Sequence, residues 1–255
     1  MNLYLSGTLW VVGVMVATGV LAVVLRKARQ KEGREANNEL AGQVFTVVGG
    51  VNVVIAAFVL ISLFDAVDNA QDTAYEEANA LVGVKWASSS LPEPARTEIN
   101  RLTRSYAIEV ADREWPNLRE SRPVGNAGWD LLGDLQQAVD GAATKNDRQE
   151  AARVEAATQV WNVYQARQQR INAAGDGVTS VVWFAILVGS VMSISLMFMF
   201  GGPKVMSYAI IVSMLAGSIG LLLFAIQQLQ NPFSGEASVG PEAFTAALAR
   251  LKQGG

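Results

Sequence analysis

The 255-residue chain contains neither cysteine nor histidine. Without cysteine it can form no disulfide, no thiolate nucleophile and no cysteine-ligated metal site. Without histidine it lacks the commonest general base and the usual ligand of zinc and copper. The sequence also contains no phosphate-cradling glycine loop and no serine elbow. We therefore expect a protein that is not an enzyme, with no catalytic residue, no metal ligand and no cofactor.

Charged residues are also absent from four long stretches of the chain. These uncharged, mainly apolar stretches are Leu3–Leu25, Val44–Phe64, Val178–Phe200 and Val205–Ile226. A helix needs about 20 apolar residues, at about 1.5 Å rise each, to cross roughly 30 Å of hydrocarbon. The chain is therefore predicted to be a multi-pass protein of the cell membrane, with the lipid bilayer as its first partner.

The four spans form two pairs and divide the chain into four parts. Residues 1–64 are expected to form a first transmembrane hairpin around a basic loop at 26–43, and residues 177–226 a second hairpin. Residues 65–176 resemble an ordinary soluble segment, inserted between the hairpins. Residues 227–255 form a tail with a short amphipathic helix, which we expect to dock on the bundle or the membrane surface. Binding of a partner protein by this helix is the alternative.

Apolar residues in the insert recur at helical spacing and show no strand-like alternation. The apolar stripes are Val67, Ala70, Ala74, Ala78 and Leu81; Ile99, Leu102, Tyr106 and Val110; and Val154, Ala157, Trp161, Tyr164 and Ile171. The first stripe predicts that the second span continues out of the membrane, and the second predicts a helix ending near Trp115-Pro116. A short helix at 127–139 and a long final helix complete the insert. The predicted fold is therefore all-α, with the aromatic rings of Tyr106, Trp161 and Tyr164 in the core.

Positive charges near the span ends predict the orientation of the chain. Residues 26–43 carry five lysines and arginines, and the predicted tight turn at 201–204 carries Lys204. Since basic residues are retained in the cytoplasm, both short connections should be cytoplasmic, and the insert and both termini extracytoplasmic. Residues 65–176 carry 18 acidic and 12 basic side chains, a net charge of −6. This balance argues against nucleic acid as a partner.

Asn52 is the most polar side chain inside any span. An amide in hydrocarbon costs several kcal/mol unless it finds a partner, so Asn52 should face the protein interior, a neighbouring subunit or water. One interpretation is a hydrogen bond between helices, and the other is a place in a pore. In the second case Asn52, Ile55 and Phe58 would form the constriction.

An acidic face follows directly after the second span. Asp65, Asp68, Asp72 and Glu76 are spaced by three, four and four residues, which places them on one side of a helix. In a symmetric oligomer with this span at its axis, they would form stacked acidic rings that concentrate cations. The alternative is a solvated helix surface. Carboxylate oxygens on such a face could also hold Ca²⁺ weakly.

Several short pieces in a fixed order resemble the bestrophin-like family of bacterial membrane proteins. They are Asn38–Gly42, Glu77–Leu81, Glu114-Trp115-Pro116, Arg167–Arg170, and Asn231–Gly235 followed by Val239, Pro241, Ala243 and Phe244. The resemblance implies two helical hairpins and a remote link to bestrophins, which are pentameric anion channels. The acidic face argues against a simple transfer of anion conduction.

We therefore predict a homo-oligomeric ion channel or pore, lined by the second span and opening into an acidic outer vestibule. The alternative is a non-conducting membrane protein, either an extracytoplasmic sensor or scaffold that binds another envelope protein, or a subunit of a larger complex. The absence of charge inside the spans disfavours a proton relay or a coupled transporter.

Overall fold

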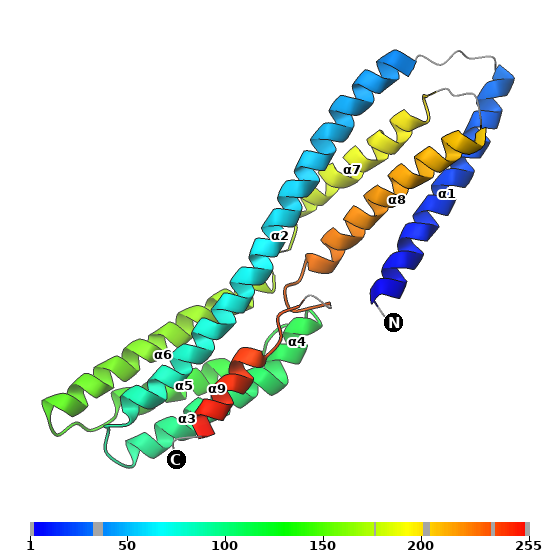
Figure 1. Cartoon of the computed structure of the whole chain (residues 1–255). Coiled ribbons are helices and arrows are strands. Elements are labelled where there is room, and N and C mark those ends of the chain that lie inside the picture. Colours follow the sequence, from blue (N-terminus) through cyan, green and yellow to red (C-terminus); the bar gives the residue numbers. More distant parts are fainter. Residues whose placement is uncertain (1–2, 33–37, 176, 201–204, 236–237, 253–255) are drawn as a thin grey trace. The chain divides into compact units, whose positions relative to one another are not determined.

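The computed structural model describes residues 3–32, 38–175, 177–200, 205–235 and 238–252, and every regular element among them is a helix (Figure 1). In chain order the helices are α1 (Leu3–Glu32), α2 (Asn38–Ser88), α3 (Ala95–Glu109), the π-helix η1 (Val110–Glu114), α4 (Trp115–Arg119), α5 (Ala127–Asp140), α6 (Asp147–Ala173), α7 (Ser180–Met197), α8 (Val205–Leu229) and α9 (Glu242–Lys252). The predicted all-α class is confirmed.

Contacts within the chain divide it into two units. The membrane unit consists of Met1–Phe64 and Gly177–Gln230, and the insert unit consists of Asp65–Asp176 and Asn231–Gly255. Helix α2 contributes its first part to the membrane unit and its last part to the insert unit. The tail thus belongs to the same unit as the insert.

In the part of the chain that the structure describes, four helices are long and apolar enough to cross a membrane. These stretches are Leu5–Ala28, Gly42–Ser88, Ser180–Met197 and Val205–Leu229. They overlap the four predicted spans, although the second continues to Ser88, beyond the predicted end at Phe64, and the protein is a multi-pass membrane protein. The predicted turn at 201–204 and part of the basic loop, residues 33–37, lie outside the described residues.

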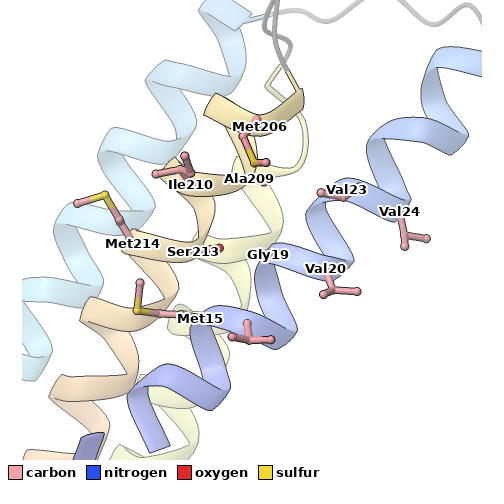
Figure 2. A pocket seen from close by; sticks show the side chains of 11 residues that line it. Met15, Gly19, Val20, Val23, Val24, Met206, Ala209, Ile210, Ser213 and Met214 are labelled. Atoms are coloured by element: carbon pink, nitrogen blue, oxygen red, sulfur yellow. The ribbon is translucent and has the colours of Figure 1, made fainter. Parts of the chain in front are cut away.

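Helices α1 and α8 of the membrane unit pack closely because small residues lie between them. A Cβ atom at Gly217 would lie 2.6 Å from Cγ of Met15, and one at Gly19 would lie 2.5 Å from Oγ of Ser213. Such contacts bring helix backbones together inside a bilayer, where the hydrophobic effect does not drive helices to associate. An apolar groove of 520 Å³ lies alongside this contact, with Ser213 as its one hydroxyl (Figure 2).

A second apolar cluster joins α2, α7 and α8 in the membrane unit. Its buried residues are Leu63, Ile186 and Ile226, and Ile55 of α2 and Trp183 of α7 pack against them. One side of α2 is therefore covered by the chain's own second hairpin.

The insert unit has one large core, to which α2, α3, α5, α6 and α9 contribute. The predicted stripes on α2 and on α3 with η1 are buried except for Val67, which is partly buried: Ala70, Ala74, Ala78, Leu81, Ile99, Leu102, Tyr106 and Val110 lie in the core. Helix α5 covers the predicted residues 127–139 and one residue more. The tail helix α9 buries Phe244, Ala247 and Leu251 in the same core, so it docks on the insert helices.

The helix that was expected to end near Pro116 continues through it. Proline has no N–H to donate, and its ring clashes with the carbonyl four residues earlier. The preceding segment Val110–Glu114 is wider, as a π-helix, and Pro116 lies in the first turn of α4, where a missing N–H costs little. Helical structure therefore persists to Arg119.

The prediction for α6 was right about the helix and wrong about its buried face. Tyr106 is buried, but Trp161 and Tyr164 are 57% and 42% exposed, and Val154 is exposed as well. The buried side carries Ala156, Val160, Val163, Ala166, Arg167 and Arg170. Hydrophobicity alone predicted the wrong buried face of α6, because the face that is buried in the structure includes Arg167 and Arg170.

Candidate functional site

Asn52 lies on the covered side of α2. It is buried, and its amide nitrogen donates to Oγ of Ser190 on α7 at 3.3 Å. This approach requires Gly189, since a Cβ there would collide with the Asn52 amide. The amide oxygen of Asn52 has no hydrogen-bond partner among the described residues. Within the single chain, Asn52 therefore bonds two helices together.

Ile55 and Phe58 lie on different sides of α2. Ile55 is half-buried against the cluster formed with α7 and α8. Phe58 is 69% exposed. The expected constriction of Asn52, Ile55 and Phe58 stays a prediction, since the structure holds a single copy of the chain.

The exposed side of α2 in the membrane unit has a regular pattern. Its members are Val47, Val51, Val54, Phe58 and Ile61, each at least half exposed. Their spacing of four, three, four and three residues is the pattern with which helices pack around a common axis. We call these five residues the apolar stripe of α2.

The four predicted acidic residues lie on the part of α2 that belongs to the insert unit. Asp65, Asp68, Asp72 and Glu76 are all exposed, and the first three continue the spacing of four and three residues from Ile61. Along the sequence, this spacing thus passes from apolar to acidic side chains between Ile61 and Asp65.

A buried cluster of charges, which was not predicted as a site, lies in the core of the insert unit. Glu77 of α2, Glu114 of η1 and both Arg167 and Arg170 of α6 have almost no exposed surface. Nη1 and Nη2 of Arg167 donate to the two Glu114 oxygens at 2.8 and 2.7 Å. We call these four residues, together with Tyr106, the ion-pair cluster.

Arg170 connects the two carboxylates of the cluster. Its Nε donates to Glu77 at 2.7 Å, and its Nη2 donates to Glu114 at 2.9 Å. The hydroxyl of Tyr106 donates to Glu77 at 2.5 Å and accepts a 3.4 Å hydrogen bond from Arg167. Two positive and two negative charges leave the cluster neutral, which is how buried charge is tolerated.

Aromatic rings cover the arginine planes of the cluster. The Arg167 guanidinium lies 4.5 Å from the ring centre of Trp129, and that of Arg170 lies 5.4 Å from Trp115 and 5.7 Å from Phe244. Desolvated cation–π contacts of this kind are worth about 2 kcal/mol. They partly replace water for Nε of Arg167 and Nη1 of Arg170, which have no hydrogen-bond partner among the described residues.

The pairing shifts the proton affinities of the cluster. Burial would raise the pKa of Glu114, but hydrogen bonds and charges from Arg167 and Arg170 outweigh burial and lower it. Burial and the neighbouring Glu77 charge raise the pKa of Tyr106 well above its ordinary value. The cluster therefore stays ionised at Glu114 and protonated at Tyr106 around neutral pH.

The tail of the chain encloses the cluster. Nε1 of Trp115 donates to the Val239 carbonyl at 3.0 Å, and its ring packs edge-on against Phe233. The side chain of Asn231 donates to the Leu118 carbonyl at 3.0 Å. The segment after the fourth span is thus part of the insert core.

No group of three or more potential metal-ligating side chains occurs in the part of the chain that the structure describes. The exposed acidic residues of α2 are therefore a face and not a coordination sphere in a single copy.

Residues 12–244 match the family model of the bestrophin-like domain. The chain belongs to the bestrophin-like family. No curated protein matches its sequence. Solved structures with the same fold match this chain over nearly their whole length.

A bacterial bestrophin homologue from Klebsiella pneumoniae, in a mutant form, has a TM-score of 0.74 at 10% identity, covering 97% of this chain and 98% of that chain. A second mutant of that homologue has a TM-score of 0.74 at 9% identity, covering 96% and 98%. The crystal structure of a membrane protein has a TM-score of 0.74 at 9% identity, covering 95% and 97%. At such low identity the likeness shows a shared fold.

The structure brings together the pieces that indicated the bestrophin-like family, except Asn38–Gly42, which lies in the membrane unit. Glu77, Glu114-Trp115, Arg167 with Arg170, and the tail residues Phe233 and Phe244 all meet at the ion-pair cluster or its aromatic cover. Sequence reasoning treated them as separate signatures. The signal that could have found the site was two arginines spaced by three residues in the otherwise uncharged stretch 156–173 of α6, together with two glutamates that balance their charge.

Two glycines of α5 provide a test of the cluster's packing. A Cβ at Gly128 would collide with Glu114 and lie 2.5 Å from Nη2 of Arg167, whereas a Cβ at Gly133 meets nothing within 4 Å. We expect Gly128→Ala to destabilise the protein by about 1–3 kcal/mol because the paired side chains must move. Gly133→Ala should stabilise it by up to about 1 kcal/mol. Thermal unfolding in detergent, followed by circular dichroism, measures both, and equal shifts would contradict the described packing.

The lowered pKa of Glu114 predicts an acid dependence of stability. Its ionised form contributes stability above the ordinary value of 4.5, and this contribution is lost as pH falls through the lowered pKa. Glu114→Gln should cost about 3–5 kcal/mol at neutral pH, since both arginines lose a charged partner. The variant's melting temperature should then fall less steeply than the parent's below pH 4.5. The exposed Glu120→Gln is the control, and parallel curves for Glu114→Gln and the parent would refute the assignment.

Proposed function

We propose that this bestrophin-like protein is a homo-oligomeric ion channel whose pore is lined by α2. The observation that carries the proposal is the exposed face of α2, where an apolar stripe in the membrane unit is followed by carboxylates at the same spacing. Copies of α2 around an axis would give a helix face with this pattern neighbours of the same kind.

The apolar stripe suits the narrow part of such a pore. A ring of apolar side chains can gate ions by excluding water, without any charge inside the membrane. Phe58 is the largest member of the stripe, and we propose that it forms the constriction. Asn52 and Ile55, on the other side of the helix, would fix the rotation of α2 against α7 and so determine which side chains reach the axis.

The acidic residues suit a vestibule that selects cations. Each copy contributes Asp65, Asp68, Asp72 and Glu76, and all four are exposed. Rings of like charge raise the local concentration of counter-ions in front of a pore. In this proposal the ions conducted are cations, and weak binding of Ca²⁺ in the vestibule would follow from the same oxygens.

The membrane orientation follows from the sequence charges. We propose that the insert unit and both termini are extracytoplasmic, with the α1–α2 connection in the cytoplasm. The vestibule would then be the outer one.

The competing function is a non-conducting, membrane-anchored sensor, scaffold or accessory subunit that binds another envelope protein. The hydrogen bond between Asn52 and Ser190 favours it, because this polar side chain then has a partner within its own subunit. The mass of the purified assembly, combined with ion flux in liposomes, separates the two functions. A ring of identical subunits that passes ions supports the channel. A monomer, or liposomes that pass no ions at any potential or pH, overturns it.

Charge removal on α2 should change selectivity. The double variant Asp68→Asn and Asp72→Asn is expected to lower the cation-to-anion permeability ratio by at least about threefold, because fewer cations gather at the entrance. Reversal potentials in planar bilayers measure this ratio. Asp130→Asn with Asp134→Asn removes the same charge from exposed residues of α5 and should leave the ratio unchanged. Equal effects of the two double variants would argue against a vestibule on α2.

A polar residue at position 58 should open the constriction. Phe58→Ser is expected to raise the conductance of the closed or resting channel, because water wets a polar ring more readily. Phe184→Ser on α7 is the matched control, with 68% exposure against 69% for Phe58. If the control leaks as much as Phe58→Ser, the α2 stripe does not line the pore.

The absence of cysteine makes the orientation directly measurable. Arg104→Cys, on the exposed side of α3, should react with a membrane-impermeant maleimide in intact cells. Lys27→Cys, at the basic end of α1, should react only after the cells are opened. The reverse labelling would show that the insert unit is cytoplasmic.

A further inference from the structure

A pocket of 370 Å³ lies between α5 and α6 of the insert unit, and its Trp129 also covers Arg167 of the ion-pair cluster. Helix α5 lines it with Trp129, Gly133, Gln136 and Asp140, which follow one another at helical spacing. Helix α6 lines it with Trp161 and Tyr164. The volume falls in the range of small-molecule sites, roughly 300–1,000 Å³.

The three aromatic rings of this pocket support one another. Tyr164 stacks on Trp161 at a centroid distance of 5.2 Å and an interplanar angle of 6°, and packs against Trp129 at 5.2 Å. Trp161 is nevertheless 57% exposed, and Tyr164 is its one ring contact among the described residues. Part of the indole is therefore exposed where Trp161 lines the pocket.

The polar groups of the pocket favour a positively charged ligand. Asp140 and Gln136 are exposed, and no basic residue lines the pocket. Arg153 interacts electrostatically with Asp140, but its guanidinium donates two hydrogen bonds to Glu150, at 3.1 and 2.5 Å. Asp140 thus has no hydrogen bond or ion pair of its side chain among the described residues.

Aromatic faces beside a carboxylate are the chemistry that recognises alkylated ammonium groups. The ring quadrupole attracts the cation, and the methyl groups need no hydrogen-bond partner. An anion would face the carboxylate and the negative ring faces, and a primary ammonium would lose its hydration with a single carboxylate to replace it. We propose that the pocket between α5 and α6 binds an organic cation with a methylated ammonium group.

Choline in its free form and the phosphocholine group of a lipid share this chemistry. The test is a calorimetric titration of the full-length protein in detergent without choline headgroups. Choline is compared with 3,3-dimethylbutan-1-ol, its neutral isostere, and with phosphocholine. We expect choline to bind at least tenfold more tightly than the neutral isostere. Tighter binding of choline than of phosphocholine would indicate a free solute as the ligand, and the reverse a lipid headgroup.

Four variants locate the binding. Trp161→Ala should weaken choline binding about tenfold or more, and Asp140→Asn should weaken choline while leaving the neutral isostere unchanged. Gly133→Leu keeps every aromatic ring and fills open space in the pocket, so it should abolish binding without unfolding α5. Trp86→Ala is the control, since Trp86 is 69% exposed and does not line the pocket.

Three binding results would overturn the proposal. They are equal affinity for choline and its neutral isostere, no binding of any of the three compounds, and loss of binding in Trp86→Ala equal to that in Trp161→Ala. The mass of each variant's assembly is measured in parallel. A change of subunit number in Gly133→Leu would assign this face to contacts between copies and would also overturn the proposal.

Discussion

Two carboxylates, two guanidinium groups and a tyrosine hydroxyl are buried together in the insert unit, and the helices around them must keep all five in contact. Glu114 accepts from both arginines, and Glu77 accepts from Arg170 and Tyr106. Because an unpaired buried charge is costly, removal of any one helix from this arrangement leaves another with an uncompensated group. The cluster therefore couples α2, α3, η1 and α6 in one core.

Such a cluster contributes more to specificity than to net stability, because desolvation offsets much of the Coulombic gain. Here it selects one rotation of α6, with the arginines inward and Trp161 outward. It also explains local features that would otherwise be separate. Gly128 leaves room for the paired side chains, and the π-helix places Glu114 just before Pro116. The tail supplies Phe244 to cover Arg170.

The membrane unit is built on a different principle. Among the described residues, its helices are held by small residues that allow close approach, by apolar contacts, and by hydrogen bonds that include those from Asn52 to Ser190 and from Tyr208 to the Met197 carbonyl. Because these contacts occupy one side of α2, the other side is left with an apolar stripe, and the same helix carries the carboxylates of the insert unit. The proposed pore depends on this division of one helix into a covered and an exposed side.

The sequence alone determined the four spans, the all-α class and the helices of the insert, because uncharged length and helical periodicity are local properties of the chain. It also placed Asp65, Asp68, Asp72 and Glu76 on one face. It could not determine the orientation of α6, since the buried side of that helix is defined by partners that lie 53 and 93 residues away in the chain. Tertiary structure alone decided which charges are neutralised in the core, that Asn52 finds its partner on α7, and that Trp161 and Tyr164 form a surface pocket. In each case the deciding quantity is the cost of burying a polar group, which is small or large according to neighbours that only the fold supplies.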